Sequence, residues 1–233
     1  MATKGATKAS YSKYVDSLIA NVIGPGIEEM LTGPFFVALR EGKLTKRQLQ
    51  GISIQHYWHN VAIIKGFALS MVRNASYDPL FYRFGENLAS EEWTHPAMCK
   101  KFGLYLGLTE EDFENATMIY EEEAFVGTII RHMYMGGNPV LGMISSLANE
   151  GLLQRASAEL DTYLQETPYN IPEDPREFFT VHAWVDIEHF SRSAEALGKA
   201  ITDEHDEALV TNRAKDLIRF QQEKWTGYLT AYA

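Results

Sequence analysis

The chain has almost no cysteine: Cys99 is the single cysteine among 233 residues. One cysteine excludes an internal disulfide and a zinc cluster of thiolates, and it fits a reducing cytosol. Apolar runs long enough to cross a membrane are missing too, and the stretch from Met1 to Ser10 lacks the apolar core of a secretory signal. We therefore expect a cytoplasmic protein whose residues 1–10 form a disordered tip.

Positive charge is also scarce, because 21 Lys and Arg against 31 Asp and Glu leave a net charge of −10. That balance argues against nucleic acid as a partner. Strand signals are nearly absent: we find no alternating apolar run bounded by turns and no Asn-Gly hairpin. Helical patterns joined by short loops predict an all-α fold, a single compact bundle of seven to eight helices, over residues 11–233.

Local start signals divide the chain into these helices. Thr45 and Thr109 each begin a capping box. Asp78, Asn138 and Asp174 are each followed by proline, which pairs an N-cap with the first helical position. The predicted helices cover residues 11–31 with an interruption at 24–26, then 35–39, 46–73, 79–106, 110–135, 139–167, a helix from 174 onward, and 204–230.

The most informative stretch carries His182, Asp186 and His189. Positions i, i+4 and i+7 fall within about 60° of one another on a helix, so two imidazoles and a carboxylate point the same way. Such nitrogen and oxygen donors suit iron, manganese or zinc. Large apolar neighbours indicate burial, and a buried Asp needs partners or a metal. A solvated Asp between two unrelated histidines is the alternative interpretation.

Two other helices offer matching donors. Glu92-Trp93-Thr94-His95 has the Glu-x-x-His form of helical bundles that hold two metal ions; Glu91, at i−4 from His95, is the alternate partner. Glu150 lies in an apolar helix, where a carboxylate is costly unless it is paired or bound to metal. Gly151 beside it predicts a close approach of another element. A surface charge next to a core histidine remains the alternative for the first pair.

Together these residues make a set of three carboxylates and three histidines on three predicted helices. The carboxylates would balance most of the charge of two divalent cations. The candidate metal ligands are Glu92, His95, Glu150, His182, Asp186 and His189.

The order of these motifs resembles that of the haem-oxygenase-like diiron oxidases and oxygenases, all-helical proteins related in fold to thiaminase II and the pyrroloquinoline-quinone synthase. The likeness covers roughly residues 35–200 and locally is similar to the 1-undecene-forming fatty-acid decarboxylase, on Phe67-Ala68-Leu69 with Met71, Glu150-Gly151 and the His182 motif. The resemblance implies a non-haem site with two Fe(II) ions that activates O2.

Two departures from the motifs of the family bear on whether the substrate is an external molecule. Thiaminase II uses a cysteine nucleophile, and the matching helix, from Ser145 to Glu150, has none. The chlamydial member that makes p-aminobenzoate consumes one of its own tyrosines and uses a lysine, and this chain has Phe36 and Leu160 at those places. We therefore expect an external substrate.

The resemblance implies an O2-dependent oxidoreductase acting on a small molecule, an amine or a carboxylate. We favour N-oxygenation of an amine over oxidative C–C cleavage or decarboxylation of a fatty acid or amino acid. A binding or regulatory protein on the same fold, and a cofactor-independent or haem-dependent enzyme, are the rivals. An external electron donor and a homodimer are compatible with the sequence; no nucleic acid or membrane partner is expected.

Three further groups of residues are candidates for supporting roles. Apolar residues at helical spacing could line the pocket or belong to the core, namely Trp58, Ile63, Phe67, Phe125 and Ile129. The histidine ligands need hydrogen-bond partners to fix their tautomers, and the candidates are Glu188, Glu177 and Asn149. Residues that could add a ligand or substrate contact, although solvated or core roles are common for them, are His56, His59 and Glu121 to Glu123.

Overall fold

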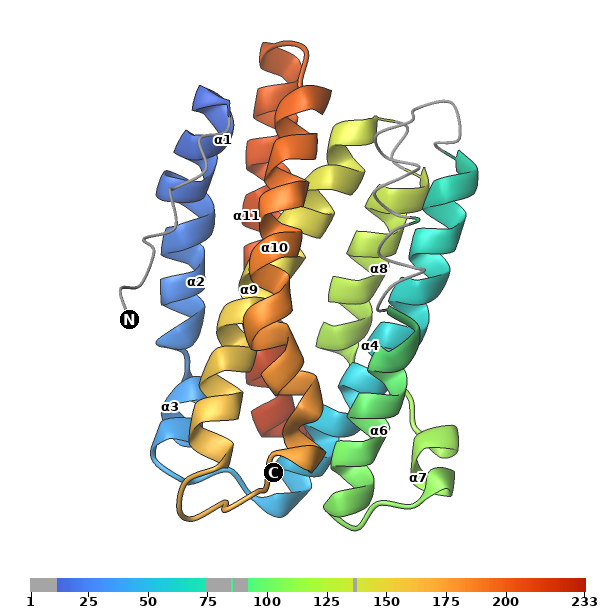
Figure 1. The fold of residues 1–233 in the computed structure, drawn as a ribbon, viewed down its shortest axis with the longest axis vertical. Helices are drawn as coiled ribbons and strands as arrows, with labels where there is room; N and C mark the ends of the chain where they lie inside the picture. Colours follow the sequence, from blue (N-terminus) through green and yellow to red (C-terminus); the bar gives the residue numbers. More distant parts are fainter. Residues whose placement is uncertain (1–11, 74–84, 86–91, 136–137) are drawn as a thin grey trace, which may run out of the picture.

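The described residues of the chain are helical, with no strand among them (Figure 1). A computed structural model describes residues 12–73, 85, 92–135 and 138–233. The predicted all-α fold is confirmed. The predicted tip at residues 1–10 and the predicted helix start at Asp78 lie outside the described residues.

The N-terminal helices run on without the predicted interruption at Gly24-Pro25-Gly26. Helix α1 (Lys13–Leu18) continues through a π-helical turn (Ile19–Ile23) into α2 (Gly24–Leu31). The backbone N–H of Gly24 donates to the carbonyl of Ile19, one residue further back than in an α-helix. Pro25, which has no N–H to donate, then stands in the first turn of α2, where its missing donor costs little.

Two capping boxes are confirmed. Helix α3 (Pro34–Arg40) is followed by α4 (Lys46–Arg73), where the backbone N–H of Thr45 donates to Gln48 Oε1 at 2.8 Å and that of Gln48 to Thr45 Oγ1 at 3.2 Å. Thr109 and Asp112 make the same reciprocal pair at α7 (Glu110–Asn115).

The helix predicted from 110 to 135 is divided. It breaks at residues 116–119 before α8 (Tyr120–Met135), because Gln55 of α4 takes over the free backbone groups there. Its amide donates to the carbonyl of Thr117 at 3.0 Å and accepts from the N–H of Ile119 at 2.9 Å. A side chain from a distant helix therefore sets this boundary.

The remaining helices carry most of the candidate site. A 3₁₀ turn (Glu92–Thr94) leads into α6 (His95–Tyr105), and α9 (Pro139–Leu164) is capped by Asn138 as predicted. A second 3₁₀ turn (Asp174–Arg176) precedes α10 (Glu177–Ala200), and α11 (Glu204–Ala231) follows. Asp174 caps nothing, contrary to prediction, since its carboxylate pairs with Lys101 at 2.8 Å.

The helices form two groups that face each other. Helices α9 and α10 pack along their lengths, with α11 against α9, while α4 packs against α6 and α8 (Figure 1). Taken singly, none of the described helices is long and apolar enough to cross a membrane; the bent pair 13–31 and 34–40 passes by length and composition alone. The apolar core and the candidate site share the space between the groups.

Gly103 allows α6, the helix of His95, to approach α4. A Cβ built on it would lie 2.6 Å from Phe113 Cζ and would also collide with Ser53 Oγ. We expect Gly103→Ala to lower the free energy of unfolding by about 1–3 kcal/mol, because both neighbours are buried. Gly127→Ala is the matched control: nothing lies within 4 Å of its Cβ position, so alanine should stabilise α8 by roughly 0.5–1 kcal/mol. Urea unfolding measures both, and equal changes would contradict the close approach.

Candidate metal centre

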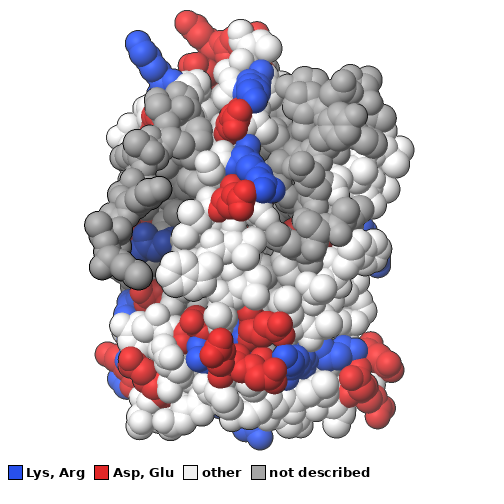
Figure 2. Space-filling view, viewed as in Figure 1, with Lys and Arg blue, Asp and Glu red and all other residues white. Residues whose placement is uncertain are grey.

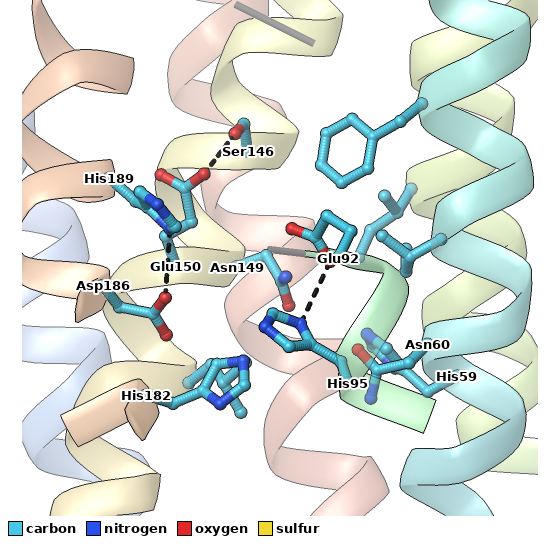
Figure 3. Close-up of a pocket in the computed structure, with 14 residues that line it drawn as sticks. His59, Asn60, Glu92, His95, Ser146, Asn149, Glu150, His182, Asp186 and His189 are labelled. Carbon is cyan, nitrogen blue, oxygen red and sulfur yellow. Dashed lines mark hydrogen bonds and ion pairs between the residues drawn. The ribbon is translucent and has the colours of Figure 1, made fainter. Parts of the chain in front are cut away.

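The six predicted ligands line one small cavity, although they come from three separate stretches of chain (Figure 3). Each side chain is buried, with exposed fractions between 3% and 8%. The cavity holds about 30 Å³, room for about two water molecules. The structure thus brings the predicted set together, while the role of these residues as ligands remains a prediction. The alternate ligand Glu91 lies outside the described residues.

Helix α10 presents its three donors inward because its charges lie on the opposite face. The ion pairs Glu188–Arg192 and Glu195–Lys199 run along the outer face, and Figure 2 shows alternating acidic and basic side chains there. His182, Asp186 and His189 occupy the buried face, as the helical period predicts.

His182 is fixed in the tautomer whose Nε2 can bind a metal. Its Nδ1 lies 2.6 Å from the backbone carbonyl of Phe178, and a carbonyl only accepts, so Nδ1 carries the proton and Nε2 keeps its lone pair. The ring of His95 is 4.3 Å away, centre to centre. Burial, and then His95, lower the pKa of His182 well below its usual value. A neutral imidazole is the form that binds a metal.

Glu92 and His95 do not share one α-helix as predicted. Glu92 belongs to the 3₁₀ turn, and His95 begins α6, where Pro96 stands in the first turn. The two side chains still meet, with Glu92 Oε2 at 3.2 Å from His95 Nδ1. The spacing of three residues suits the tighter 3₁₀ turn, in which positions i and i+3 eclipse.

Glu150 is oriented by two serines that the sequence did not identify. Ser146 Oγ donates to one carboxylate oxygen and Ser193 Oγ to the other, each at 2.7 Å. The close approach predicted at Gly151 is confirmed, since a Cβ there would lie 2.7 Å from the ring of Phe190 on α10. Gly151 therefore lets α10 bring its ligands against α9.

Asp186 has one carboxylate oxygen without a hydrogen-bond partner, which indicates whether a metal ion fits here. Its Oδ1 lies 3.4 Å from His189 Nδ1, but its Oδ2 is buried and has no hydrogen-bond partner in the structure. Burial is the main cause that raises the pKa of Asp186 to about 7. A carboxylate oxygen left bare among imidazoles is the group that a cation would satisfy, so these residues fit a metal ion.

The donors do not yet form a finished site. Among the residues that the structure describes, no three His, Cys, Asp or Glu side chains are placed to hold a metal ion. The reason is local: Glu92 and Asp186 pair with histidines, and Glu150 with serines.

The supporting residues differ in part from those predicted. Ile63, Phe67, Ile129 and Asn149 line the cavity, as do His59 and Asn60. Trp58 instead donates to the carbonyl of Phe113 at 3.0 Å. Neither glutamate proposed to orient the histidines does so, because Glu188 pairs with Arg192 and Glu177 with Lys101.

Comparisons with known proteins show which family and fold the chain is similar to. A family described as iron-containing redox enzyme matches residues 54–221. A 4-aminobenzoate synthase from Chlamydia pneumoniae is 29% identical, covering 78% of this chain and 82% of its own, and one from Nitrosomonas europaea is 26% identical, covering 77% and 75%. A solved TenA homologue from Pseudomonas syringae pv. tomato superimposes with a TM-score of 0.80 at 15% identity, covering 98% of both chains.

A solved domain with a haem-oxygenase-like fold from Shewanella denitrificans also superimposes, with a TM-score of 0.75 at 17% identity and covering 90% of both chains. These structures establish the haem-oxygenase-like fold of the chain and nothing about activity. The family match supports a redox enzyme, and the two curated relatives are named as 4-aminobenzoate synthases, so neither supports the local likeness to the fatty-acid decarboxylase. The family match spans most of the chain, including all six residues of the candidate centre. The chain therefore belongs to the iron-containing redox enzyme family.

Proposed function

We propose that the chain is an O2-dependent oxidase or oxygenase with a non-haem diiron centre. Glu92, His95, Glu150, His182, Asp186 and His189 would together hold a pair of Fe(II) ions. The bare Oδ2 of Asp186 carries the proposal, because it is a buried carboxylate oxygen without a hydrogen-bond partner. Bound iron would supply the electrons that reduce O2.

The protein's own part is to orient the donors and exclude water. Ser146 and Ser193 fix the carboxylate plane of Glu150, and the Phe178 carbonyl fixes the tautomer of His182. Apolar side chains of Ile63, Phe67 and Ile129 close the cavity. Such a small, buried and preorganised pocket protects reactive species and strengthens each charge inside it.

For the substrate we favour a small amine that is oxidised on nitrogen. The curated relatives are named for a product, 4-aminobenzoate, that carries both an amine and a carboxylate. Phe36 and Leu160, which replace the tyrosine and the lysine consumed or used in the chlamydial member, are fully buried in the core, so an external molecule is expected. Because 4-aminobenzoate also carries a carboxylate, oxidative C–C cleavage of a carboxylic acid is the alternative.

A binding or regulatory protein on the same fold is the rival from another class. Metal content separates the two, since a regulator with an empty site would bind no iron. Incubating candidate amines and carboxylic acids with Fe(II) protein and O2 then separates the chemistries: oxygen mass gained on nitrogen indicates N-oxygenation, and release of CO2 or an alkene indicates cleavage.

Anaerobic titration with Fe(II), followed by the spectrum of the bound ion, tests the centre. We expect saturation near two ions per chain and, for His189→Ala, loss of at least one of them, because an imidazole in the cavity disappears. His205→Ala is the matched control, since His205 is exposed and lies outside the cavity. Equal binding by wild type and His189→Ala would remove the diiron proposal.

A further inference from the structure

A second buried cluster of polar side chains lies beside the cavity and is not used by the proposed metal centre. Its members come from α4, α8 and α11, and none is more than 4% exposed. They are His56, His59, Glu122, Lys224 and Tyr228. Among them only His59 also lines the cavity, so it connects the two.

The cluster is organised around one carboxylate. His59 Nδ1 lies 2.6 Å from Glu122 Oε1, and the Tyr228 hydroxyl donates to Oε2 of the same group. The ammonium of Lys224 lies over aromatic rings, 4.8 Å from the centre of Phe125 and 5.1 Å from that of Trp225. Glu122 thus receives one donor from α4 and one from α11, across a sequence separation of 63 and 106 residues.

The charges of the cluster keep Glu122 ionised. Burial alone raises the pKa of this carboxyl, but Lys224 and then the hydrogen bond from His59 lower it to about 2. Burial lowers the pKa of Lys224, and Glu122 opposes that change. Because an ionised carboxylate only accepts, Nδ1 of His59 carries the proton and Nε2 is the nitrogen that exchanges protons with its surroundings.

Stability does not explain this arrangement. Removing charges from water costs several kcal/mol per ion, and a buried ion cluster is often matched or exceeded in stability by apolar residues of similar volume. A carboxylate that orients an imidazole and stabilises its charged form is, however, a recurrent device for proton transfer.

We propose that His59 is the acid–base residue of the cavity and that Glu122 is its positioning residue. The inference rests on the proposed function, in which reducing O2 requires protons inside a closed pocket. One N–H bond breaks: the Nε2 proton of the imidazolium passes to an oxygen atom that O2 supplies, and the electrons come from Fe(II). The imidazole is left neutral, with its Nδ1–H still on Glu122, and regains a proton from water.

The described ring contacts of His59 are with His56, at 6.2 Å between ring centres, and with Phe125, at 5.8 Å. The charged or titratable groups that surround it on the neighbouring elements are His56, Glu122, Lys224, Tyr228 and, across the cavity, Glu92 and His95. Variants of Glu122 and Tyr228 therefore change the partner of His59 without touching a proposed metal ligand.

Nitrogen NMR of the metal-free full chain, labelled at histidine, reports which ring nitrogen of His59 carries a proton and so tests its pairing with Glu122. His59→Gln assigns the signal. In wild type we expect the proton on Nδ1 in the neutral ring. Glu122→Gln should move the midpoint of His59 protonation down by about one pH unit or more, because the opposite charge is lost. Tyr228→Phe should move it up, since Glu122 loses a hydrogen-bond donor and becomes a stronger partner.

Glu123→Gln is the matched control, because Glu123 is the exposed next residue of α8, and it should leave the midpoint unchanged. A neutral ring protonated on Nε2, or the same midpoint in all variants, would overturn the proposal. If Glu122→Gln fails to fold, the tautomer of His59 in the wild type and the shift in Tyr228→Phe still test the pair. Opposite shifts from the two variants cannot arise from a merely structural cluster.

A second arm separates this proposal from the metal centre. His59→Gln should still bind two Fe(II) ions per chain but consume O2 about 100-fold more slowly in a single turnover. Loss of iron from His59→Gln would make His59 a ligand and overturn its acid–base role. If the wild type bound no iron, the diiron proposal would be wrong. The NMR measurement would still test whether Glu122 positions His59.

Discussion

Asp186→Asn should make the metal-free protein more stable and should nearly abolish its iron binding. The gain follows from the burial of the carboxylate, whose pKa is raised to about 7. At pH 8 the folded chain holds a buried anion with an unpartnered oxygen, and asparagine removes that charge at nearly the same volume. We expect roughly 2–4 kcal/mol of added stability at pH 8.

The pH dependence of this gain has a defined sign. A carboxyl whose folded pKa lies above its unfolded value binds more protons when folded, so its penalty is absent near pH 4 and fully present above pH 7. The Asn variant should therefore match wild type at pH 4 and exceed it at pH 8. Urea unfolding of the metal-free proteins measures the difference, and a variant less stable than wild type at pH 8 would mean that Asp186 serves the fold.

Iron binding should change in the opposite direction. Loss of a ligating carboxylate should weaken Fe(II) binding by more than about 100-fold, beyond the effect of removing an outer-shell partner. Glu188→Gln, on the exposed face of the same helix, is the matched control: it removes a surface ion pair with Arg192, should cost at most about 1 kcal/mol, and should leave iron binding intact. Opposite signs for stability and binding are the mark of a site kept for function.

The part of this site that lies on α10 could be predicted from sequence, because helical periodicity alone fixes which residues share a face. His182, Asp186 and His189 needed no knowledge of neighbouring helices. The same holds for the capping boxes at Thr45 and Thr109, whose bonds span three residues. Local rules sufficed wherever the partners lie within one turn.

The other contacts around the site, and one helix boundary, depend on packing between elements that are distant in the sequence. Glu122 follows Glu121 and precedes Glu123 near the start of a helix, a pattern typical of a solvated first turn, yet it is fully buried. Only the approach of α4 and α11 makes it the partner of His59 and Tyr228. The break after α7 depends in the same way on Gln55. No periodicity in one segment could have revealed these contacts.

Acid should unfold the metal-free protein steeply, beginning just below pH 6.5. Burial is the main cause that lowers the pKa of His56 to about 3 and that of His132 to about 4, and it takes that of His182 well below 6.5. All three are neutral in the folded chain and take up protons on unfolding. Since the unfolded state binds more protons, stability falls as pH falls through this window.

Asp186 acts against this trend, because between pH 7 and 4 it is the folded state that holds its proton. Three protons gained on unfolding and one released leave a net uptake of two near pH 5. The free energy of unfolding should then fall by about 2.7 kcal/mol for each pH unit. From pH 6.5 to 4.5 the loss is roughly 5 kcal/mol, comparable with the whole stability of many domains.

Urea unfolding at pH 7, 6 and 5 measures the slope. His132→Gln should reduce it by about 1.4 kcal/mol per pH unit, since one buried neutral imidazole is removed. His205→Gln, at an exposed position, should leave the slope as it is. A slope near zero would show that these histidines take up protons as readily in the folded state as in the unfolded state, and burial would then not favour the neutral form of His182 that a metal needs.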